Sequence, residues 1–101
     1  MKKDLKLVSL MDLYGQLLTS RQAETLSGYY EFDLSLGELA LNLGITRQAV
    51  KDSLDKAEAA LKAYEEQFKL LTVCGELQKA KEVNDGERLQ IINNILAMFN
   101  Y

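Results

Sequence analysis

The 101-residue sequence contains no histidine, no proline, no tryptophan and a single cysteine, Cys74. Without histidine, the chain lacks the side chain that most often transfers protons near neutral pH. One cysteine cannot close an intramolecular disulfide, and without a second cysteine or a histidine the sequence has no zinc-type ligand set. We therefore expect no metal site and no cofactor, and we expect Cys74 to be a small buried hydrophobic residue.

Long apolar runs are also missing, since no stretch approaches the roughly 18 residues that a membrane span needs. The lysines at the start resemble the beginning of a signal peptide, but Asp4, Lys6 and Asp12 interrupt the apolar residues that follow. The lack of proline suits a chain that is helical nearly throughout. We expect an amphipathic first helix and a single-domain-sized, all-α cytoplasmic protein without a membrane span.

Basic residues are fewer than acidic ones, so the formal net charge is −3 and the isoelectric point is near 4.9. Strong general binding to nucleic acids relies on many lysine and arginine contacts to phosphate. A local basic face can still exist on an acidic protein. The overall charge therefore permits DNA binding without indicating it.

The most informative stretch is residues 35–57, SLGELALNLGITRQAVKDSLDKA. Ser35 followed by Glu38 has the spacing of a capping box, which marks the start of a helix. Apolar residues then recur at helical spacing, at Leu36, Leu39, Ala40 and Leu43. Gly44 can end this helix in a left-handed conformation at little steric cost. We expect the small side chain of Ala40 to let a second helix approach closely.

The second helix of this stretch follows at once. Thr46 can cap it, and Ile45 can fill the space between the two crossing helices. Its apolar stripe consists of Val50, Leu54 and Ala57, whereas Arg47, Gln48 and Lys51 point elsewhere. This pattern predicts a helix-turn-helix whose second helix lies in the major groove of DNA. A plain helical hairpin is the alternative that the same spacing allows.

Two helices are predicted ahead of this motif. The first covers residues 4–18, with Gly15 as a weak point within it. Thr19 and Gln22 form a second capping-box pattern, and the helix that it starts continues to about Tyr30. Arg21 lies near this start, where backbone N–H groups can also bind a phosphate. We expect Phe32 and Leu34 to hold the following loop against the core.

Behind the motif, the second helix lacks a stop signal before Gly75 and should continue to about Phe68 or beyond. A short helix after Gly75, a turn at residues 84–86 and a last helix over residues 87–99 complete the chain. The last helix carries a wide apolar face that a second copy of the chain or the long helix could cover. We expect a helix-turn-helix domain at residues 1–68 and C-terminal helices at 69–101 that form a homodimer.

The stretch LLTSRQAETLSGYYEFDLSLGELALNLGITRQAV resembles the YlxM family of small bacterial helix-turn-helix proteins. The same block is similar to region four of sigma-70-type factors, which recognises the −35 promoter element. The similarity covers residues 13–64, and GITRQAV at residues 44–50 is its most specific part. It implies a cytoplasmic, often dimeric, DNA-binding regulator. Because such proteins are encoded beside components of the signal recognition particle, it also implies a protein partner in protein targeting.

The resemblance to region four implies that Thr46, Arg47, Gln48 and Lys51 contact bases and phosphates. Chemically, Arg47 suits a guanine edge or a phosphate, Gln48 suits adenine, and Thr46 and Lys51 suit phosphate. Arg21 is a fifth candidate for DNA contact. The alternative for these side chains is an ordinary solvated helix surface.

Two carboxylates, Asp52 and Asp55, lie on the helix that should meet DNA, and carboxylates repel phosphate. This observation keeps a second hypothesis open, in which the chain is a helical adaptor that binds protein rather than specific DNA. An enzyme is not expected, since no phosphate-binding glycine loop or activated nucleophile is present. The adjacent acids Glu65 and Glu66 point about 100° apart on a helix and suggest solvated surface.

Overall fold

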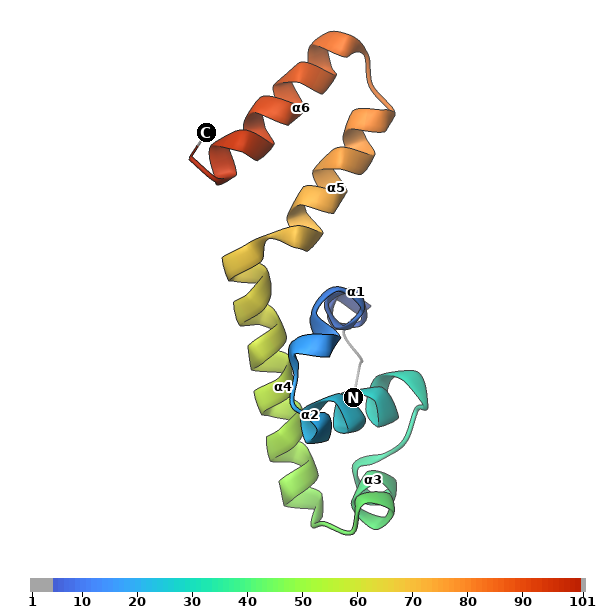
Figure 1. The fold of residues 1–101 in the computed structure, drawn as a ribbon. Coiled ribbons are helices and arrows are strands. Elements are labelled where there is room, and N and C mark those ends of the chain that lie inside the picture. Colours follow the sequence, from blue (N-terminus) through green and yellow to red (C-terminus); the bar gives the residue numbers. More distant parts are fainter. Residues whose placement is uncertain (1–4, 101) are drawn as a thin grey trace. The chain divides into compact units, whose positions relative to one another are not determined.

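The computed structural model describes residues 5–100, and within them the chain forms six α-helices and no strand (Figure 1). The prediction of an all-α helix-turn-helix fold is confirmed. The chain divides into two compact units, one ending at Gln67 and one beginning at Phe68. Within residues 5–100, no helix combines the length and the apolar character that a membrane span requires. The expected start of the first helix, Asp4, lies outside the described residues.

Helix α1 spans Leu5–Tyr14 and is followed by one 3-10 turn, η1, at Gly15–Leu17. The helix expected to run to residue 18 therefore ends four residues earlier, at the weak point that Gly15 creates. Its buried face consists of Leu7, Leu10 and Tyr14. The hydroxyl of Tyr14 donates a hydrogen bond of 2.8 Å to Oε1 of Glu65, which attaches α1 to the long helix α4.

Helix α2 spans Ser20–Leu26, and its predicted capping box is present, with Thr19 and Gln22 bonded to each other's backbone N–H groups. The helix does not continue regularly to Tyr30, because the chain widens into a π-helical turn, η2, over Ser27–Glu31. Gly28 in this turn lies directly against α3. A Cβ atom added at Gly28 would lie 2.3 Å from Cδ2 of Leu39. This close contact with α3 therefore depends on Gly28, which the sequence analysis does not single out.

The loop before α3 corrects another expectation. Phe32 is 70% exposed and does not hold the loop against the core. Asp33, the next residue, adopts a left-handed conformation with φ of 56°. Leu34 is half-buried, and its N–H donates to the carbonyl of Gly28 at 3.0 Å. The N–H of Phe32 donates to the carbonyl of Ser27 at 3.1 Å, so Leu34 and two backbone bonds connect the loop to the preceding turn.

Helices α3 (Leu36–Leu43) and α4 (Arg47–Phe68) complete the N-terminal unit. Burial is greatest along one stripe of α4, at Val50, Leu54, Ala57 and Leu61. Leu26 and Tyr29 from the preceding turns are also buried. Burying a leucine or valine side chain stabilises the fold by about 1.5–3 kcal/mol. Helix α4 is therefore the element on which the helices of this unit pack.

The C-terminal unit is a helical hairpin of α5 (Leu70–Lys81) and α6 (Asp85–Met98), as Figure 1 shows. Gly75 lies inside α5, so the expectation that a helix begins after it is wrong. The break comes at Lys69 instead, in a left-handed conformation with φ of 58°. There the ammonium group of Lys69 donates to the carbonyl of Met98 at 3.1 Å and lies 5.8 Å from the centre of the Phe99 ring.

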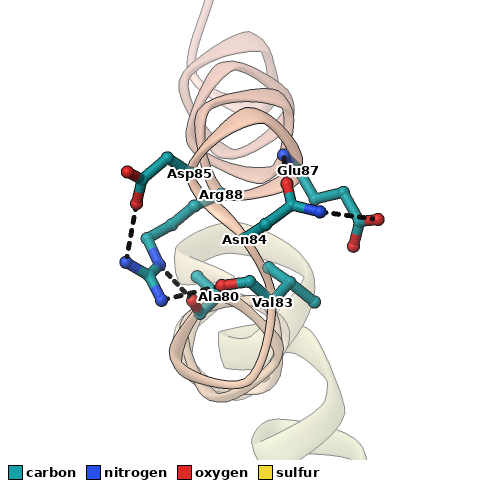
Figure 2. A network of polar contacts seen from close by, with 6 residues as sticks. All are labelled: Ala80, Val83, Asn84, Asp85, Glu87 and Arg88. Atoms are coloured by element: carbon teal, nitrogen blue, oxygen red, sulfur yellow. Dashed lines mark hydrogen bonds and ion pairs between the residues drawn. The ribbon is translucent and has the colours of Figure 1, made fainter.

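Polar contacts organise the turn between α5 and α6 (Figure 2). Nε of Arg88 donates to the carbonyl of Ala80 at 2.6 Å, and another guanidinium nitrogen donates to the carbonyl of Val83 at 2.8 Å. Arg88 also pairs with Asp85 at 3.2 Å. Asn84 caps α6 by accepting from the N–H of Glu87 at 2.9 Å. The two bonds from Arg88 satisfy carbonyl groups that have no helical partner at and just after the end of α5.

Cys74 is exposed on α5, which contradicts the expectation of a buried thiol. The reason is the thinness of the hairpin. Among residues 68–100, Ala80 is the one apolar residue that is buried. Two helices packed on each other bury only one narrow stripe of each, so most positions on α5 stay accessible to solvent.

Candidate nucleic-acid interface

The first helix of the candidate interface, α3, begins at the predicted capping box. Oγ of Ser35 accepts from the N–H of Glu38 at 3.1 Å, and Oε1 of Glu38 accepts from the N–H of Ser35 at 3.0 Å. The Ser35 backbone N–H, followed by its hydroxyl, lowers the pKa of Glu38 from its usual value. Glu38 is therefore ionised at neutral pH, at the end of the helix dipole that favours negative charge.

The turn between α3 and α4 has the predicted conformation. Gly44 is left-handed, with φ of 67° and ψ of 34°, and its N–H donates to the carbonyl of Ala40. The N–H of Ile45 donates to the same carbonyl at 3.1 Å. Thr46 then caps α4, since its Oγ1 accepts from the N–H of Ala49 at 3.0 Å. The turn therefore fixes Arg47 as the first residue of α4.

The structure places the four candidate residues of the motif on one exposed section of chain. Thr46, Arg47, Gln48 and Lys51 are all exposed to solvent. The hydroxyl oxygen of Thr46 is engaged as a helix cap, but its O–H remains able to donate to a ligand. The Arg47 side chain forms no ion pair or hydrogen bond with any residue between 5 and 100. Arg47 is thus available to an external acceptor.

The two aspartates of α4, Asp52 and Asp55, have partners within the helix. Nε2 of Gln48 donates to Oδ1 of Asp52 at 2.9 Å, and Nζ of Lys51 lies 2.7 Å from Oδ1 of Asp55. Both pairs span one helical turn, where side chains face each other. The hydrogen bond and charge of Asp55 raise the pKa of Lys51. Asp52 and Asp55 therefore contact two of the candidate side chains directly.

Arg21 belongs to a different surface, a groove of about 330 Å³ between α2 and α4. Arg21 and Gln22 of α2 line it, together with Thr19, which caps that helix. Ala49, Asp52, Ser53 and Lys56 line it from α4. Thr46, Arg47, Gln48 and Lys51 are not among these residues. The structure thus brings four candidates together on the motif and places the fifth in a neighbouring groove.

Sequence reasoning missed Lys56 and Ser53 as parts of this groove. A signal was present, because the α4 residues that line it are spaced at three, four and seven positions from Ala49. That spacing places them on one helix face. Which element would cover that face could not be known before α2 was placed.

The structure offers no group of three or more cysteine, aspartate or glutamate side chains that could hold a metal ion within residues 5–100. The expectation of two solvated acids at the end of α4 is wrong for one of them. Glu65 is half-buried and accepts a hydrogen bond from the hydroxyl of Tyr14, whereas Glu66 is exposed. Glu65 therefore connects α1 to α4.

A model of the family described as "Putative helix-turn-helix protein, YlxM / p13 like" matches residues 1–96. The chain belongs to this family. The match extends through both units of the structure and includes the left-handed turn at Gly44. The family description names a DNA-binding type of motif and no enzymatic activity.

Several relatives of this chain carry the name UPF0122 protein. One from Shouchella clausii is 40% identical over 101 residues, covering 93% of this chain and 91% of the relative. One from Halalkalibacterium halodurans is 40% identical over 89 residues, covering 84% and 82%. A third, from Desulforamulus reducens, is 49% identical over 72 residues, which span 71% of this chain but only 62% of that relative.

Proposed function

We propose that this protein binds duplex DNA through the start of α4, which enters the major groove. The observation that carries the proposal is the exposed pair Arg47 and Gln48 on the first turn of α4, directly after the left-handed Gly44. A recognition helix contacts base edges with its first residues. Arg47 has no partner among residues 5–100, so contact with a guanine edge or a phosphate breaks no existing bond.

Gln48 suits adenine because of its bond to Asp52. A carboxylate can only accept, so the amide nitrogen of Gln48 must face Asp52. This leaves one N–H and the carbonyl oxygen of the amide available. Adenine offers the complementary pair in the major groove, an acceptor at N7 and a donor at N6. Asp52 therefore helps to orient Gln48, in addition to the repulsion that its charge exerts on phosphate.

Lys51, one helical turn after Gln48, is the candidate for a contact to phosphate. Its ion pair with Asp55 is exposed, since the two side chains are 46% and 55% accessible. Exposed pairs of this kind are weak and are screened by salt. A DNA phosphate can therefore replace Asp55 as the partner of Lys51, while Thr46 donates its hydroxyl to a neighbouring phosphate.

We further propose that two copies associate through the C-terminal helices, which would give a dimer with two recognition helices. Large apolar side chains of α5 and α6 are exposed in the single chain, including Leu77, Leu89, Ile92 and Leu96. A pair of recognition helices would read half-sites about 34 Å apart. In its most specific form, the proposal is that the protein is a cytoplasmic transcription regulator similar to sigma region four. It would act in the signal recognition particle pathway.

A helical adaptor is the second candidate, and one observation favours it. Both Gln48 and Lys51 are bonded to carboxylates of their own helix, so neither is free as Arg47 is. In this case the exposed apolar residues of the C-terminal unit would bind a protein of the targeting pathway. Such a contact would depend little on salt, whereas a DNA complex weakens steeply as salt rises.

The test is selection of bound sequences from a random duplex library, followed by gel shifts at low and physiological salt. We expect Arg47→Ala and Gln48→Ala to weaken binding to the selected sequence by roughly 5- to 150-fold each, since a good base contact contributes about 1–3 kcal/mol. Gln67→Ala, exposed at the other end of α4, is the control and should bind normally. Absence of any shift at low salt would reject DNA binding and favour the adaptor.

A further inference from the structure

The groove between α2 and α4 brings together positive side chains that are distant in the sequence. Arg21 comes from the first turn of α2, and Lys56 comes from the third turn of α4. Figure 1 shows α2 beside α4, and the hydroxyl groups of Thr25 and Ser53 lie 3.0 Å apart between the two helices. The two cations therefore lie on opposite walls of one concave surface of about 330 Å³.

Neither cation is used by the fold. The side chains of Arg21 and Lys56 form no ion pair and no hydrogen bond with residues 5–100, although several acids lie on the same helices. The other lysine of this part of α4, Lys51, is paired with Asp55. The positive charges of Arg21 and Lys56 are therefore available to an anionic ligand in the groove.

The remaining lining supplies one neutral hydrogen-bond donor, Gln22. The hydroxyl of Thr25 donates to the backbone carbonyl of Arg21, so the Ser53 hydroxyl donates to Thr25 and its hydrogen is already used. The amide nitrogen of Gln22 stays free, because only its carbonyl oxygen serves the capping box. One carboxylate, Asp52, lines the groove as well, and it accepts from Gln48. The groove thus combines two cations and a neutral donor with a single acid.

We infer that this groove binds a phosphate group through Arg21 and Lys56, with Gln22 as a further donor. The inference rests on the proposed function for the source of that phosphate, which is the backbone of the duplex held by α4. Lys56 is two turns along α4 from Gln48, roughly 12 Å at 1.5 Å per residue. That distance suits a backbone phosphate beside the base pairs that Gln48 contacts. The contact positions the protein on DNA and reads no sequence.

The first test measures how the affinity for duplex DNA depends on salt. Each phosphate contact contributes about 0.9 to the slope of log affinity against log salt. We expect Arg21→Gln and Lys56→Gln each to lower this slope by about 0.9 and to weaken binding equally for all sequences. Lys62→Gln is the matched control, because Lys62 is exposed on α4 and does not line the groove. Unchanged slopes for both variants, with normal binding by the unaltered protein, would overturn the inference.

The second test separates this site from the proposed function. Inorganic phosphate is titrated into the full chain at constant ionic strength while backbone amide shifts are followed by NMR. A titration with chloride, free of sulfate, is the reference. We expect shifts at Gln22 and Ser53 that Arg21→Gln abolishes, with no shift at Leu77 of α5. If the protein binds no DNA but these shifts occur, DNA binding is rejected and the phosphate site stands. If phosphate causes no shift there, the site is rejected.

Discussion

The two units of this chain stabilise themselves in different ways. The N-terminal unit buries a set of apolar side chains almost completely, with Leu26, Val50 and Leu61 each at 0% exposure. The C-terminal hairpin buries Ala80 and leaves Leu89 60% exposed and Leu77 50% exposed. Its turn and its end are instead held by polar contacts of Arg88 and Lys69. The first unit therefore has a core within one chain, whereas the second leaves large apolar side chains exposed to solvent.

The largest expected effect compares a leucine of each unit. Leu61→Ala should lower the free energy of unfolding by about 2–5 kcal/mol, since it leaves a cavity in a closed core. Leu89→Ala should change it by less than about 0.5 kcal/mol at a concentration where the chain is monomeric. Chemical denaturation followed by circular dichroism measures both values. A large loss for Leu89→Ala that grows with protein concentration would show that a second copy covers α6.

The next effect concerns the polar contacts that replace a core in the hairpin. Arg88→Gln removes bonds to the carbonyl groups of Ala80 and Val83, and we expect a loss of about 1–3 kcal/mol in the stability of the hairpin. Amide hydrogen exchange measures it, as faster exchange in α5 and α6 with little change in α1 to α3. The control is Lys79→Gln, which breaks only an exposed pair with Glu76. Equal protection in both variants would contradict a structural role for Arg88.

The smallest effect is a pH dependence confined to the N-terminal unit. The pKa of Glu38 is lowered in the folded state by the N–H and hydroxyl of Ser35, so its ionised form stabilises the fold. This contribution is complete above the pKa of the unfolded chain and is lost as pH falls through the lowered folded value. Glu38→Gln keeps the cap but removes the titration. Melting temperatures between pH 2 and 6 should fall less steeply for this variant, and parallel curves would refute the assignment.

Local signals in the sequence predicted the motif well. The capping boxes at Thr19 and Ser35, the left-handed Gly44 and the Thr46 cap are all present as predicted. Each depends on residues no more than four positions apart, whose chemistry acts on their own backbone. The exposure of Arg47 and Gln48 also followed from helical periodicity. The binding roles of these residues remain predictions.

Errors arose wherever distant segments decide the outcome. The sequence predicts that a helix begins after Gly75, yet Gly75 lies inside α5, and the break at Lys69 coincides with contacts to Met98 and Phe99 at the end of α6. Cys74 was expected to be buried but is exposed, because a two-helix hairpin covers so little of α5. A single sequence shows a residue's own preferences but not the surface against which it packs.

The sequence by itself determined the helical class, the turn at Gly44 and the residues that α4 presents first, because backbone capping and periodicity are properties of neighbouring residues. Only the tertiary structure decided that Gly28 lies against Leu39, that Glu65 binds Tyr14, and that Arg21 and Lys56 share a groove. These are contacts between residues distant in the chain. They depend on how the helices cross, which a helix's own periodicity does not specify.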